Sequence, residues 1–430
     1  MVRSAASVRI APARRFHGRF TLPGDKSISH RVAILGAMAE GETRIANFST
    51  AADCAATLRC LSGLGVDLRR RDETVVIAGR GPAGLAAPRE VLEAGNSGST
   101  LRMLAGVVAA CPFHSVLDGD DSLRRRPMER VAEPLRAMGA RVATTDGRPP
   151  LTIDGGPLRG LRWEMPVASA QVKTAILLAG LQADGITTVH EPSPSRDHTE
   201  RLLPAFGVEV RGHGGDVSVT GRHPLRATAL TVPGDVSSAA FLVVAALIRP
   251  DSEVRIEGVL LNPRRTAFLE VLKQMGASVE TGVTHEDPEP VGWIRVRASA
   301  LRGAVIPATA VPALIDEIPI LAIAATRAEG TLAVSGAAEL RAKESDRIAA
   351  LCEGLRRMGA RIEERPDGFI LEGGRRLKGA VVRSHGDHRI AMALAVAALS
   401  ADGETEIEDA ECAAVSFPGF YDVLQRGARG

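Results

Sequence analysis

The sequence predicts an α/β protein of two halves, each built from three similar units, and three observations support this prediction. An ending of the form helix–glycine–strand recurs along the chain, and so does a series of helices rich in small and aliphatic residues. Segments rich in alternating β-branched residues, such as "RDETVVIAG", "GDVSVTG" and "GWIRVRA", fall between these helices. Because internal repeats decide the fold class, we expect each unit to be a β-α-β-α-β-β piece.

The recurring ending predicts helix C-termini. Its copies are "LSGLGVDL", "LRAMGARV", "LPAFGVEV", "LKQMGASV" and "LRRMGARI", which place glycines at Gly65, Gly139, Gly207, Gly276 and Gly359. In each copy an amphipathic helix is expected to end on the glycine, before a strand begins. A weaker sixth copy, "LQRGAR", places a glycine at Gly427.

The helices that open the units are predicted to be buried, because they are apolar on nearly all sides. They are "SISHRVAILGAMA", "NSGSTLRMLAGVVAA", "SAQVKTAILLAGL", "SSAAFLVVAALI", "DEIPILAIAAT" and "DHRIAMALAVAAL". The segment "VPGDVSSAAF" at Val232 also repeats "LPGDKSISHR" at Leu22, so the chain divides into two halves. We expect one domain over residues 22–232 and a second over residues 1–21 together with 233–430. The alternative, an array of helical repeats, does not account for the strand-like segments.

Composition excludes several classes of function. Hydrophobic residues make up 45% and charged residues 24% of the 430 residues, as in ordinary globular proteins. The net charge of +2 and the aromatic content of 3% give no indication of a nucleic-acid or membrane partner. An odd number of cysteines without a CxxC pair fits a reducing cytoplasm, so we expect a cytoplasmic protein. A metal site or disulfide framework is not expected, since no CxxC pair occurs. The cysteines are Cys54, Cys60, Cys111, Cys352 and Cys412.

The first 24 residues contain arginines and no acidic residue, which is a composition typical of transit peptides. They lack an apolar segment, however, and "SVRIAP" has the pattern of a strand. We therefore favour a strand of the fold over a targeting role. The arginines are Arg3, Arg9, Arg14, Arg15 and Arg19.

The stretch "TLPGDKSISHR", Thr21 to Arg31, is the first candidate for chemistry. Gly24 and Asp25 suit a tight turn, and Ser27 or Ser29 suits the N-cap of the following helix. Lys26 and Arg31 would then lie at a helix N-terminus, where free N–H groups and the dipole favour an anion. The alternative is a capped helix that carries two solvated cations.

Polar residues occupy the same place in the other units, the first turn of the buried helix. Since an unpaired buried charge is costly, each needs a partner or a ligand. The residues are Asn96, Ser97, Gly98 and Arg102, then Ser169, Gln171 and Lys173, then Asp316 and Glu317, then Asp387, His388 and Arg389. The fourth unit, "GDVSSAA", offers only serines, and we interpret it as structural.

Charge also begins the second helix of several units, in "LRRRPM", "SRDHTE" and "RAKESDR". If the units are related by symmetry, these ends converge on a cleft with many cations and a few carboxylates. Such a cleft fits a small polyanion, which arginine binds through forked hydrogen bonds. Alone, Asp316 could be an N-cap and "DHR" a cap with a surface pair. The glycine-rich "GNSGST" lacks the GK[ST] ending of a nucleotide-binding loop.

Taken together, these motifs are similar to those of 5-enolpyruvylshikimate-3-phosphate synthases, from about Val8 to Val423. The resemblance implies a two-domain inside-out α/β barrel of six βαβαββ repeats, three per domain, with the active site in the interdomain cleft. It implies transfer of the enolpyruvyl (carboxyvinyl) group of phosphoenolpyruvate to the 5-hydroxyl of shikimate 3-phosphate, which releases phosphate on the route to chorismate and aromatic amino acids. It also implies a monomer without metal or organic cofactor, and competition between the inhibitor glyphosate and phosphoenolpyruvate.

The resemblance carries roles to residues that match its motifs. It implies Asp316 as the base on the 5-hydroxyl and Glu344 as the acid that protonates the methylene carbon, with Lys26 beside them. Glu344 would then need a raised pKa, which burial can provide. The implied shikimate 3-phosphate contacts are Lys26, Ser27, Arg31, Ser169, Gln171, Arg196, Asp316 and Lys343. The implied phosphoenolpyruvate contacts are Lys26, Gly98, Arg126, Gln171, Arg347 and Arg389.

Two positions depart from the family pattern. Val415 stands where some members carry a late lysine, and Ala170 where some carry a second serine. The second hypothesis is a UDP-N-acetylglucosamine enolpyruvyl transferase, which shares the fold. Lys26-Ser27, in place of Lys-Asn, and the cysteine-free "LDGDDSLRRRPM" argue against it. A repeat-built binding module without catalysis would leave Asp316 and Glu344 unexplained.

Overall fold

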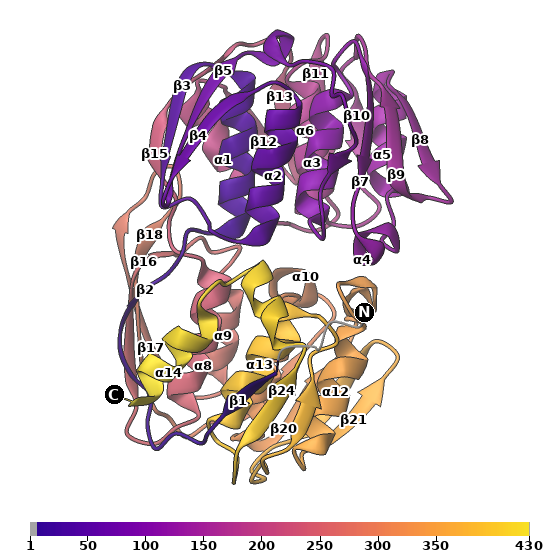
Figure 1. The fold of residues 1–430 in the computed structure, drawn as a ribbon. Coiled ribbons are helices and arrows are strands. Elements are labelled where there is room, and N and C mark those ends of the chain that lie inside the picture. Colours follow the sequence, from indigo (N-terminus) through magenta and orange to yellow (C-terminus); the bar gives the residue numbers. More distant parts are fainter. Residues whose placement is uncertain (1–6, 430) are drawn as a thin grey trace. The chain divides into compact units, whose positions relative to one another are not determined.

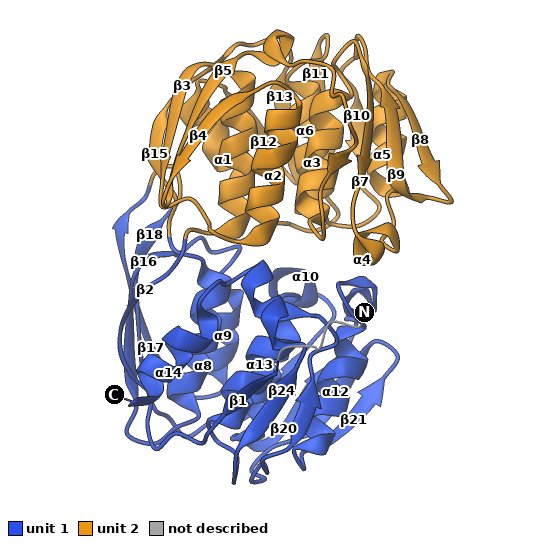
Figure 2. Ribbon diagram, viewed as in Figure 1, with its two compact units in different colours: residues 1–23, 234–286, 290–430 blue, residues 24–233, 287–289 orange. Residues whose placement is uncertain are grey.

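The computed structural model describes residues 7–429, and its chain divides into two compact units (Figures 1 and 2). Unit 1 comprises residues 1–23, 234–286 and 290–430, and unit 2 comprises residues 24–233 and 287–289. Residues 1–6 and 430 of the expected second domain, and with them Arg3, lie outside the described residues. The mixed α/β class predicted from the sequence is confirmed.

Within the described residues, unit 2 contains three sheets, each with its strands in a non-sequential order. The first joins β14 (Leu225–Arg226), β3 (Ala39–Ala46), β5 (Thr74–Arg80) and β4 (Asp67–Arg71), with β15 (Ala229–Thr231) also on β3. The second joins β6 (Leu92–Glu93), β7 (His114–Asp118), β9 (Arg148–Asp154) and β8 (Arg141–Thr145). The third joins β10 (Arg162–Glu164), β11 (Ile186–His190), β13 (Asp216–Thr220) and β12 (Val210–His213).

The described part of unit 1 contains three further sheets. The first joins β2 (His17–Thr21), β16 (Glu253–Leu260), β18 (Val291–Arg297) and β17 (Ser278–His285). The second joins β19 (Arg302–Ile306), β20 (Glu329–Val334), β22 (Gly368–Glu372) and β21 (Arg361–Arg365). The third joins β1 (Val8–Ile10), β24 (Thr405–Glu408) and β23 (Val381–Arg383).

The four-stranded sheets share one pattern of pairing. In the sheet of β6 to β9, the first two strands are parallel, and the fourth strand pairs antiparallel with both the second and the third. The sheets that begin with β10 and β19 repeat this pattern. A parallel pair needs a crossover helix, whereas an antiparallel pair needs only a hairpin. Each of these sheets therefore follows the order β-α-β-α-β-β along the chain.

The two halves of the chain exchange one strand each. β2 directly precedes α1 (Lys26–Met38), yet it pairs in parallel with β16, which follows α8 (Val236–Leu247). β15 directly precedes α8, yet it pairs in parallel with β3, which follows α1. The repeated Pro-Gly-Asp segments lie where the chain passes from one unit to the other, after Pro23 and after Pro233.

The helices that open the repeats form the core of each unit, as the sequence predicts. In unit 2 they are α1, α3 (Gly98–Val108) and α6 (Ala170–Gly180), and in unit 1 they are α8, α11 (Ile318–Thr326) and α13 (His388–Ala398). Nearly all their residues are buried. Gly106 allows α3 to pack tightly on α6, because a Cβ there would lie 2.1 Å from the carbonyl oxygen of Ala175. In unit 1, α8, α11 and α13 also pack against one another.

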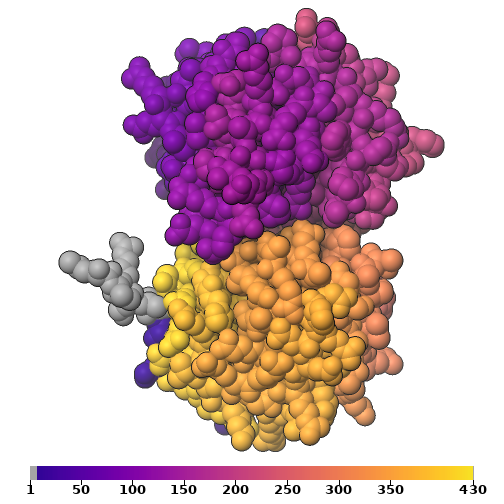
Figure 3. All heavy atoms as spheres, turned by 90° about the vertical axis from the view of Figure 1, so that its right-hand side faces the viewer, coloured from indigo at the N-terminus to yellow at the C-terminus, as the bar shows by residue number. Residues whose placement is uncertain are grey.

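The remaining helices are more exposed and complete the repeats. They are α2 (Ala52–Gly63), α4 (Asp121–Arg124), α5 (Glu129–Met138), α7 (His198–Leu202), α9 (Ala267–Gln274), α10 (Val311–Leu314), α12 (Arg347–Arg357) and α14 (Phe420–Arg429). Short 3-10 segments cover Pro82–Gly84, Leu203–Phe206, Ala338–Ala342 and Ala410–Val415. Seen from the side of β8 and β21, each unit presents a continuous layer of side chains (Figure 3). Among residues 7–429, none of the helices has the length and apolar character of a membrane span.

The glycines of the recurring ending have the predicted left-handed backbone. Their φ angles range from 81° to 116°, values that a side chain would strain. The prediction is wrong for Gly427, which lies inside α14 rather than after a helix. A Cβ at Gly427 would lie 2.4 Å from the ring of Phe16, so close packing explains this glycine.

Candidate active site

The first turn of α1 places Lys26 beside a carboxylate. Lys26 Nζ donates to Asp53 Oδ2 of α2 over 2.9 Å, and both side chains are mostly buried. The predicted serine N-cap is wrong: Asp25 caps the helix, and its Oδ1 accepts from the backbone N–H of Ile28 at 2.9 Å. Ser29 instead accepts a hydrogen bond from the backbone N–H of Ser49. The carboxylate is the stronger acceptor for the positive end of the helix dipole.

Arg31 connects three helices of unit 2. Its Nε donates to Thr199 Oγ1 of α7 at 2.9 Å, and its Nη2 donates to Thr174 Oγ1 of α6 at 3.0 Å. Its Nη1 donates to the carbonyl oxygen of Ser27, one turn earlier on α1, at 2.8 Å. Arg31 as a whole is 4% exposed. These contacts fix Arg31 between the first turns of α1 and α6.

The first turn of α3 brings Gly98, Gln171 and Arg126 together. Gln171 accepts from Arg102 Nη1 at 2.5 Å and donates to Ser99 Oγ at 2.8 Å. A Cβ at Gly98 would lie 2.8 Å from Arg102 Nη1 and 3.5 Å from Arg126 Nη1. Sequence reasoning named Arg102 as a residue of this turn but assigned it no role, and the structure places it at the centre of the group.

The remaining predicted residues of unit 2 lie around α6 and α7. Ser169 is the N-cap of α6, and Arg196 lies two residues before α7. Lys173, in contrast, points into the core, where it is fully buried between Glu191 Oε2 at 2.7 Å and Glu200 Oε1 at 2.6 Å. Lys173 therefore serves the core of unit 2 rather than its surface.

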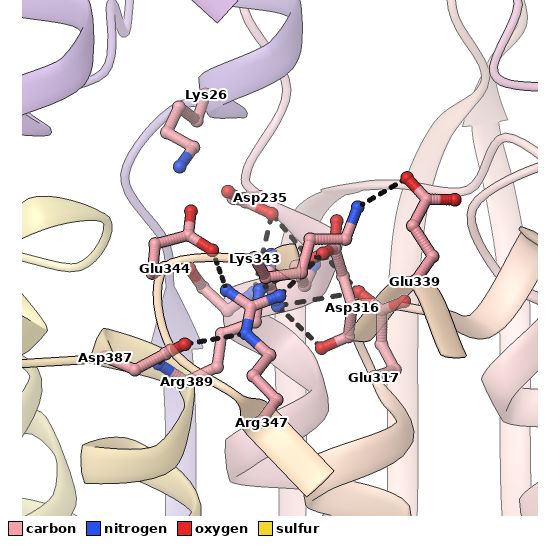
Figure 4. Close-up of polar contacts among 12 residues, drawn as sticks. Lys26, Asp235, Asp316, Glu317, Glu339, Lys343, Glu344, Arg347, Asp387 and Arg389 are labelled. Atoms are coloured by element: carbon pink, nitrogen blue, oxygen red, sulfur yellow. Dashed lines mark hydrogen bonds and ion pairs between the residues drawn. The ribbon is translucent and has the colours of Figure 1, made fainter. Parts of the chain in front are cut away.

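Arg347, the first residue of α12, lies among three carboxylates in unit 1 (Figure 4). Its Nε contacts Asp387 Oδ2 at 2.8 Å, its Nη2 contacts Glu344 Oε2 at 2.6 Å, and its Nη1 contacts Asp316 Oδ1 at 3.3 Å. The side chain is 2% exposed. Burial by itself would lower the pKa of Arg347, but the carboxylates of Asp387, Glu344 and Asp316 outweigh it and raise that pKa. The cluster thus keeps its central cation charged.

Arg389, in the first turn of α13, also contacts Asp316. Its Nη1 donates to the backbone carbonyl oxygen of Asp316 at 3.0 Å, and its Nε lies 3.5 Å from Asp316 Oδ1. Glu317, not Asp316, occupies the N-cap position of α11, and it makes no capping bond from its side chain. The alternative that Asp316 merely caps a helix is therefore wrong. Its carboxylate contacts two guanidinium groups (Figure 4).

Lys343 lies outside the set of contacts around Arg347. Its Nζ pairs with Glu339 Oε1 at 3.2 Å, and its side chain is one-quarter exposed (Figure 4). Lys343 directly precedes Glu344 in the chain. The two neighbouring residues therefore make different contacts, Lys343 with a carboxylate and Glu344 with a guanidinium.

The fourth repeat has more polar contacts at the start of its buried helix α8 than its sequence suggested. Asp235 caps α8 through a 2.8 Å hydrogen bond from the backbone N–H of Ser237. Ser237 in turn accepts from Arg265 Nη2 at 2.9 Å and donates to the buried Glu317. The interpretation of this turn as only structural serines overlooked Asp235. The repeated Pro-Gly-Asp segment was the signal that could have identified it.

No set of histidine, cysteine or acidic side chains in the described part of the chain is arranged to hold a metal ion. The cysteines are free, and burial raises the pKa of Cys60, Cys111, Cys352 and Cys412 to about 12. These thiols are therefore protonated near neutral pH and poor nucleophiles.

Each unit thus gathers polar side chains at the N-terminal ends of its three buried helices. Unit 2 offers cations and helix N-termini that suit phosphate or carboxylate groups. Unit 1 adds carboxylates beside cations, and carboxylates can carry protons to and from a substrate. The set in unit 2 therefore suits the binding of an anion, and the set in unit 1 suits proton transfer.

Comparison with known proteins identifies the family. The family model described as EPSP synthase (3-phosphoshikimate 1-carboxyvinyltransferase) matches residues 10–424. Proteins named 3-phosphoshikimate 1-carboxyvinyltransferase are similar to the chain. The protein from Desulforudis audaxviator is 51% identical over 97% of this chain and 98% of its own length. The protein from Geobacillus kaustophilus is 52% identical over 95% of this chain and 97% of its own length.

The fold of the chain is also similar to that of a solved EPSP synthase from Acinetobacter baumannii. The two structures have a TM-score of 0.88 and 45% sequence identity, and the similarity covers 98% of each chain. Sequence and structure thus agree over nearly the whole length, and the chain belongs to the EPSP synthase (3-phosphoshikimate 1-carboxyvinyltransferase) family.

Proposed function

We infer that this protein transfers the enolpyruvyl group of phosphoenolpyruvate to the 5-hydroxyl of shikimate 3-phosphate. The products are 5-enolpyruvylshikimate 3-phosphate and phosphate, and the reaction belongs to the shikimate pathway to aromatic amino acids. The observation that carries this conclusion is the family match over residues 10–424. Phosphate and carboxylate groups on both substrates agree with the many cations at the helix N-termini.

We further propose the finer features of the fold that the sequence predicted. The six sheets, each with its opening helix, would be six βαβαββ repeats of an inside-out α/β barrel. The domains would comprise residues 22–232, and residues 1–21 with 233–430. The active site would take residues from both domains, and the protein would act as a cytoplasmic monomer.

In this proposal, unit 2 binds most of shikimate 3-phosphate. Arg31 is held by neutral hydroxyl and carbonyl oxygens at the first turns of α1 and α6, where a phosphate would also find backbone N–H groups. The proposed contacts are Lys26, Ser27, Arg31, Ser169, Gln171, Arg196, Asp316 and Lys343.

Phosphoenolpyruvate would bind where small and cationic residues meet. Gly98 has no side chain to crowd the guanidinium groups of Arg102 and Arg126, which lie close beside it, and Arg347 and Arg389 add two more forked donors. The proposed contacts are Lys26, Gly98, Arg126, Gln171, Arg347 and Arg389.

The carboxylates would divide the proton transfers between them. Asp316 would take the proton of the 5-hydroxyl as its oxygen attacks C2 of phosphoenolpyruvate, while Glu344 would deliver a proton to the methylene carbon. The resulting tetrahedral intermediate loses phosphate and returns one proton of its new methyl group to the ionised Glu344, which restores the C=C bond and forms the enol ether. Arg347 contacts both carboxylates, so a substrate anion that competes for Arg347 would favour the protonated form of Glu344.

A turnover assay tests this function. Purified protein should release phosphate from phosphoenolpyruvate when shikimate 3-phosphate is present, and not with phosphoenolpyruvate alone. UDP-N-acetylglucosamine in place of shikimate 3-phosphate provides the control for the second enolpyruvyl transferase activity. Release with UDP-N-acetylglucosamine and none with shikimate 3-phosphate would contradict the conclusion.

A further inference from the structure

The short helix α7 contacts a residue of the candidate site, although it is too short to be stable by itself. It spans only five residues, His198–Leu202, and isolated helices of that length are not stable in water. Yet its Thr199 accepts from Arg31 at 2.9 Å, and Arg196 lies two residues before the helix in the chain. Other parts of the chain must therefore fix the position of α7.

A buried hydrogen bond between a histidine and a carboxylate holds the first residue of this helix. His198 Nδ1 lies 2.6 Å from Glu289 Oε1, and the two side chains are 0% and 2% exposed. A carboxylate accepts hydrogen bonds, so His198 Nδ1 carries the hydrogen. Arg201, one turn later on α7, lies 3.9 Å from Glu289 Oε2 and 3.0 Å from Asp197 Oδ2.

Glu289 reaches this place from a distant part of the sequence. It follows His198 by 91 residues and belongs to the turn between β17 and β18. Those two strands lie in a sheet of unit 1, whereas residues 287–289 belong to unit 2. At this turn the chain leaves unit 1 for only three residues, and one of them is the partner of His198.

The next residues of α7 are held from other directions. Thr199 hydrogen-bonds Thr174 of α6 at 2.6 Å as well as Arg31. Glu200 pairs with the fully buried Lys173 at 2.6 Å, and burial raises the pKa of Glu200 although Lys173 opposes the shift. Successive helical residues point about 100° apart, so these three contacts together set both the position and the rotation of α7.

The pair of His198 with Glu289 is informative because stability alone does not require it. Replacement of both partners of a buried hydrogen bond by apolar groups of the same shape can leave stability nearly unchanged. A hydrogen bond between buried groups, in contrast, fixes direction, and the low dielectric strengthens it. An element that presents a hydroxyl to Arg31 benefits from such a fixed direction.

We propose that Glu289 is a positioning residue for substrate binding: it holds His198, and through α7 it sets Thr199, Arg31 and Arg196 for shikimate 3-phosphate. Glu289 itself contacts α7 rather than the substrate. The inference rests on the proposed function, because it concerns the binding of that substrate.

The test compares variants of Glu289 in the full-length protein. Glu289→Ala removes the acceptor, and Glu289→Gln keeps an oxygen at nearly the same place. Glu286→Ala, an exposed residue of the same turn, is the matched control. Titration calorimetry gives Kd for shikimate 3-phosphate, and initial rates give kcat and KM. We expect Glu289→Ala to raise Kd and KM for shikimate 3-phosphate by about tenfold or more, the scale of one lost hydrogen bond to a charged group, and to change kcat by less than about threefold.

In the same experiment we expect the Kd and KM of Glu289→Gln to stay within about threefold of the wild type. We expect Glu286→Ala to leave Kd, KM and kcat unchanged. If Glu289→Ala does not fold, Glu289→Asp is tested in its place. Aspartate keeps the charge, but its shorter side chain moves the acceptor away from His198 by one methylene. We expect the same rise in Kd for shikimate 3-phosphate. A Kd for Glu289→Ala or Glu289→Asp within twofold of the wild type would overturn the proposal, as would a fall in kcat with Kd unchanged. Wild-type turnover with shikimate 3-phosphate is measured first, so a failure of the function itself is seen separately.

Discussion

Replacement of Arg347 by methionine should destabilise unit 1 more than any exposed substitution on the same helix. Arg347 is 2% exposed and contacts Asp387, Glu344 and Asp316 at 2.6 to 3.3 Å. Methionine fills a similar volume but leaves these carboxylates close together without their shared cation. Of the three, Asp387 has a side chain with no exposed area, so solvent cannot take over that role.

The structure sets the expected magnitude. Removing one partner of a buried ion pair costs about 3–5 kcal/mol, because the other charge stays buried. For a unit of roughly 200 residues, this corresponds to a fall in Tm of about 6–20 °C. The control Arg357→Met lies on the same helix, where Arg357 is 53% exposed and pairs with Glu353 at 2.9 Å. That surface pair should contribute no more than about 1 kcal/mol.

Differential scanning calorimetry of both variants measures the two losses. The double variant Arg347→Met/Asp387→Asn should be less impaired than Arg347→Met and Asp387→Asn added together, since the two groups are in contact. Asparagine keeps an oxygen that can accept from the backbone N–H of Arg389, as Asp387 does at 2.9 Å. A Tm for Arg347→Met equal to that of Arg357→Met would refute the reasoning, and additive losses in the double variant would show that the contact is not energetically coupled.

Three further predictions follow from other residues. Asp316→Ala should lower kcat by at least about 10²-fold while shikimate 3-phosphate still binds; near-normal turnover would mean that Asp316 is not the base. Gly98→Ala should raise the Ki for glyphosate in steady-state inhibition assays, because the added methyl group would lie 2.8 Å from Arg102 Nη1; equal inhibition of both proteins would contradict this steric argument. Burial, then Lys26 and Arg31, hold the pKa of His30 well below 6.5. The unfolded chain therefore takes up a proton that the folded chain does not, and stability falls below about pH 6.5 by up to about 1.4 kcal/mol per pH unit. Denaturant titrations from about pH 7 to about pH 5 should show a smaller fall for His30→Gln than for the wild type or the exposed control His223→Gln; equal falls would exclude His30 as the cause.

The sequence by itself determined the elements whose signal is local. Helices that are apolar on all sides can only be buried, and α8 and α11 are. A glycine between an amphipathic helix and a strand, such as Gly139, must turn the chain, and it has a φ of 116°. The motifs also placed Arg347, Asp316 and Glu344 on the same list of candidates before any coordinates, although their roles in the reaction stay predictions.

Only the tertiary structure decided which side chains are partners. Asp25 rather than a serine caps α1, Arg102 holds Gln171, and Glu289 pairs with His198 from 91 residues away. The strand partners of β2 and β15, which are β16 and β3, are likewise not given by any local pattern. The physical reason is that periodicity and capping depend on neighbours within a few residues. Ion pairs and strand pairs instead depend on which distant surfaces the folded chain brings together. From the sequence alone, many of its cations could have paired with any one of its carboxylates.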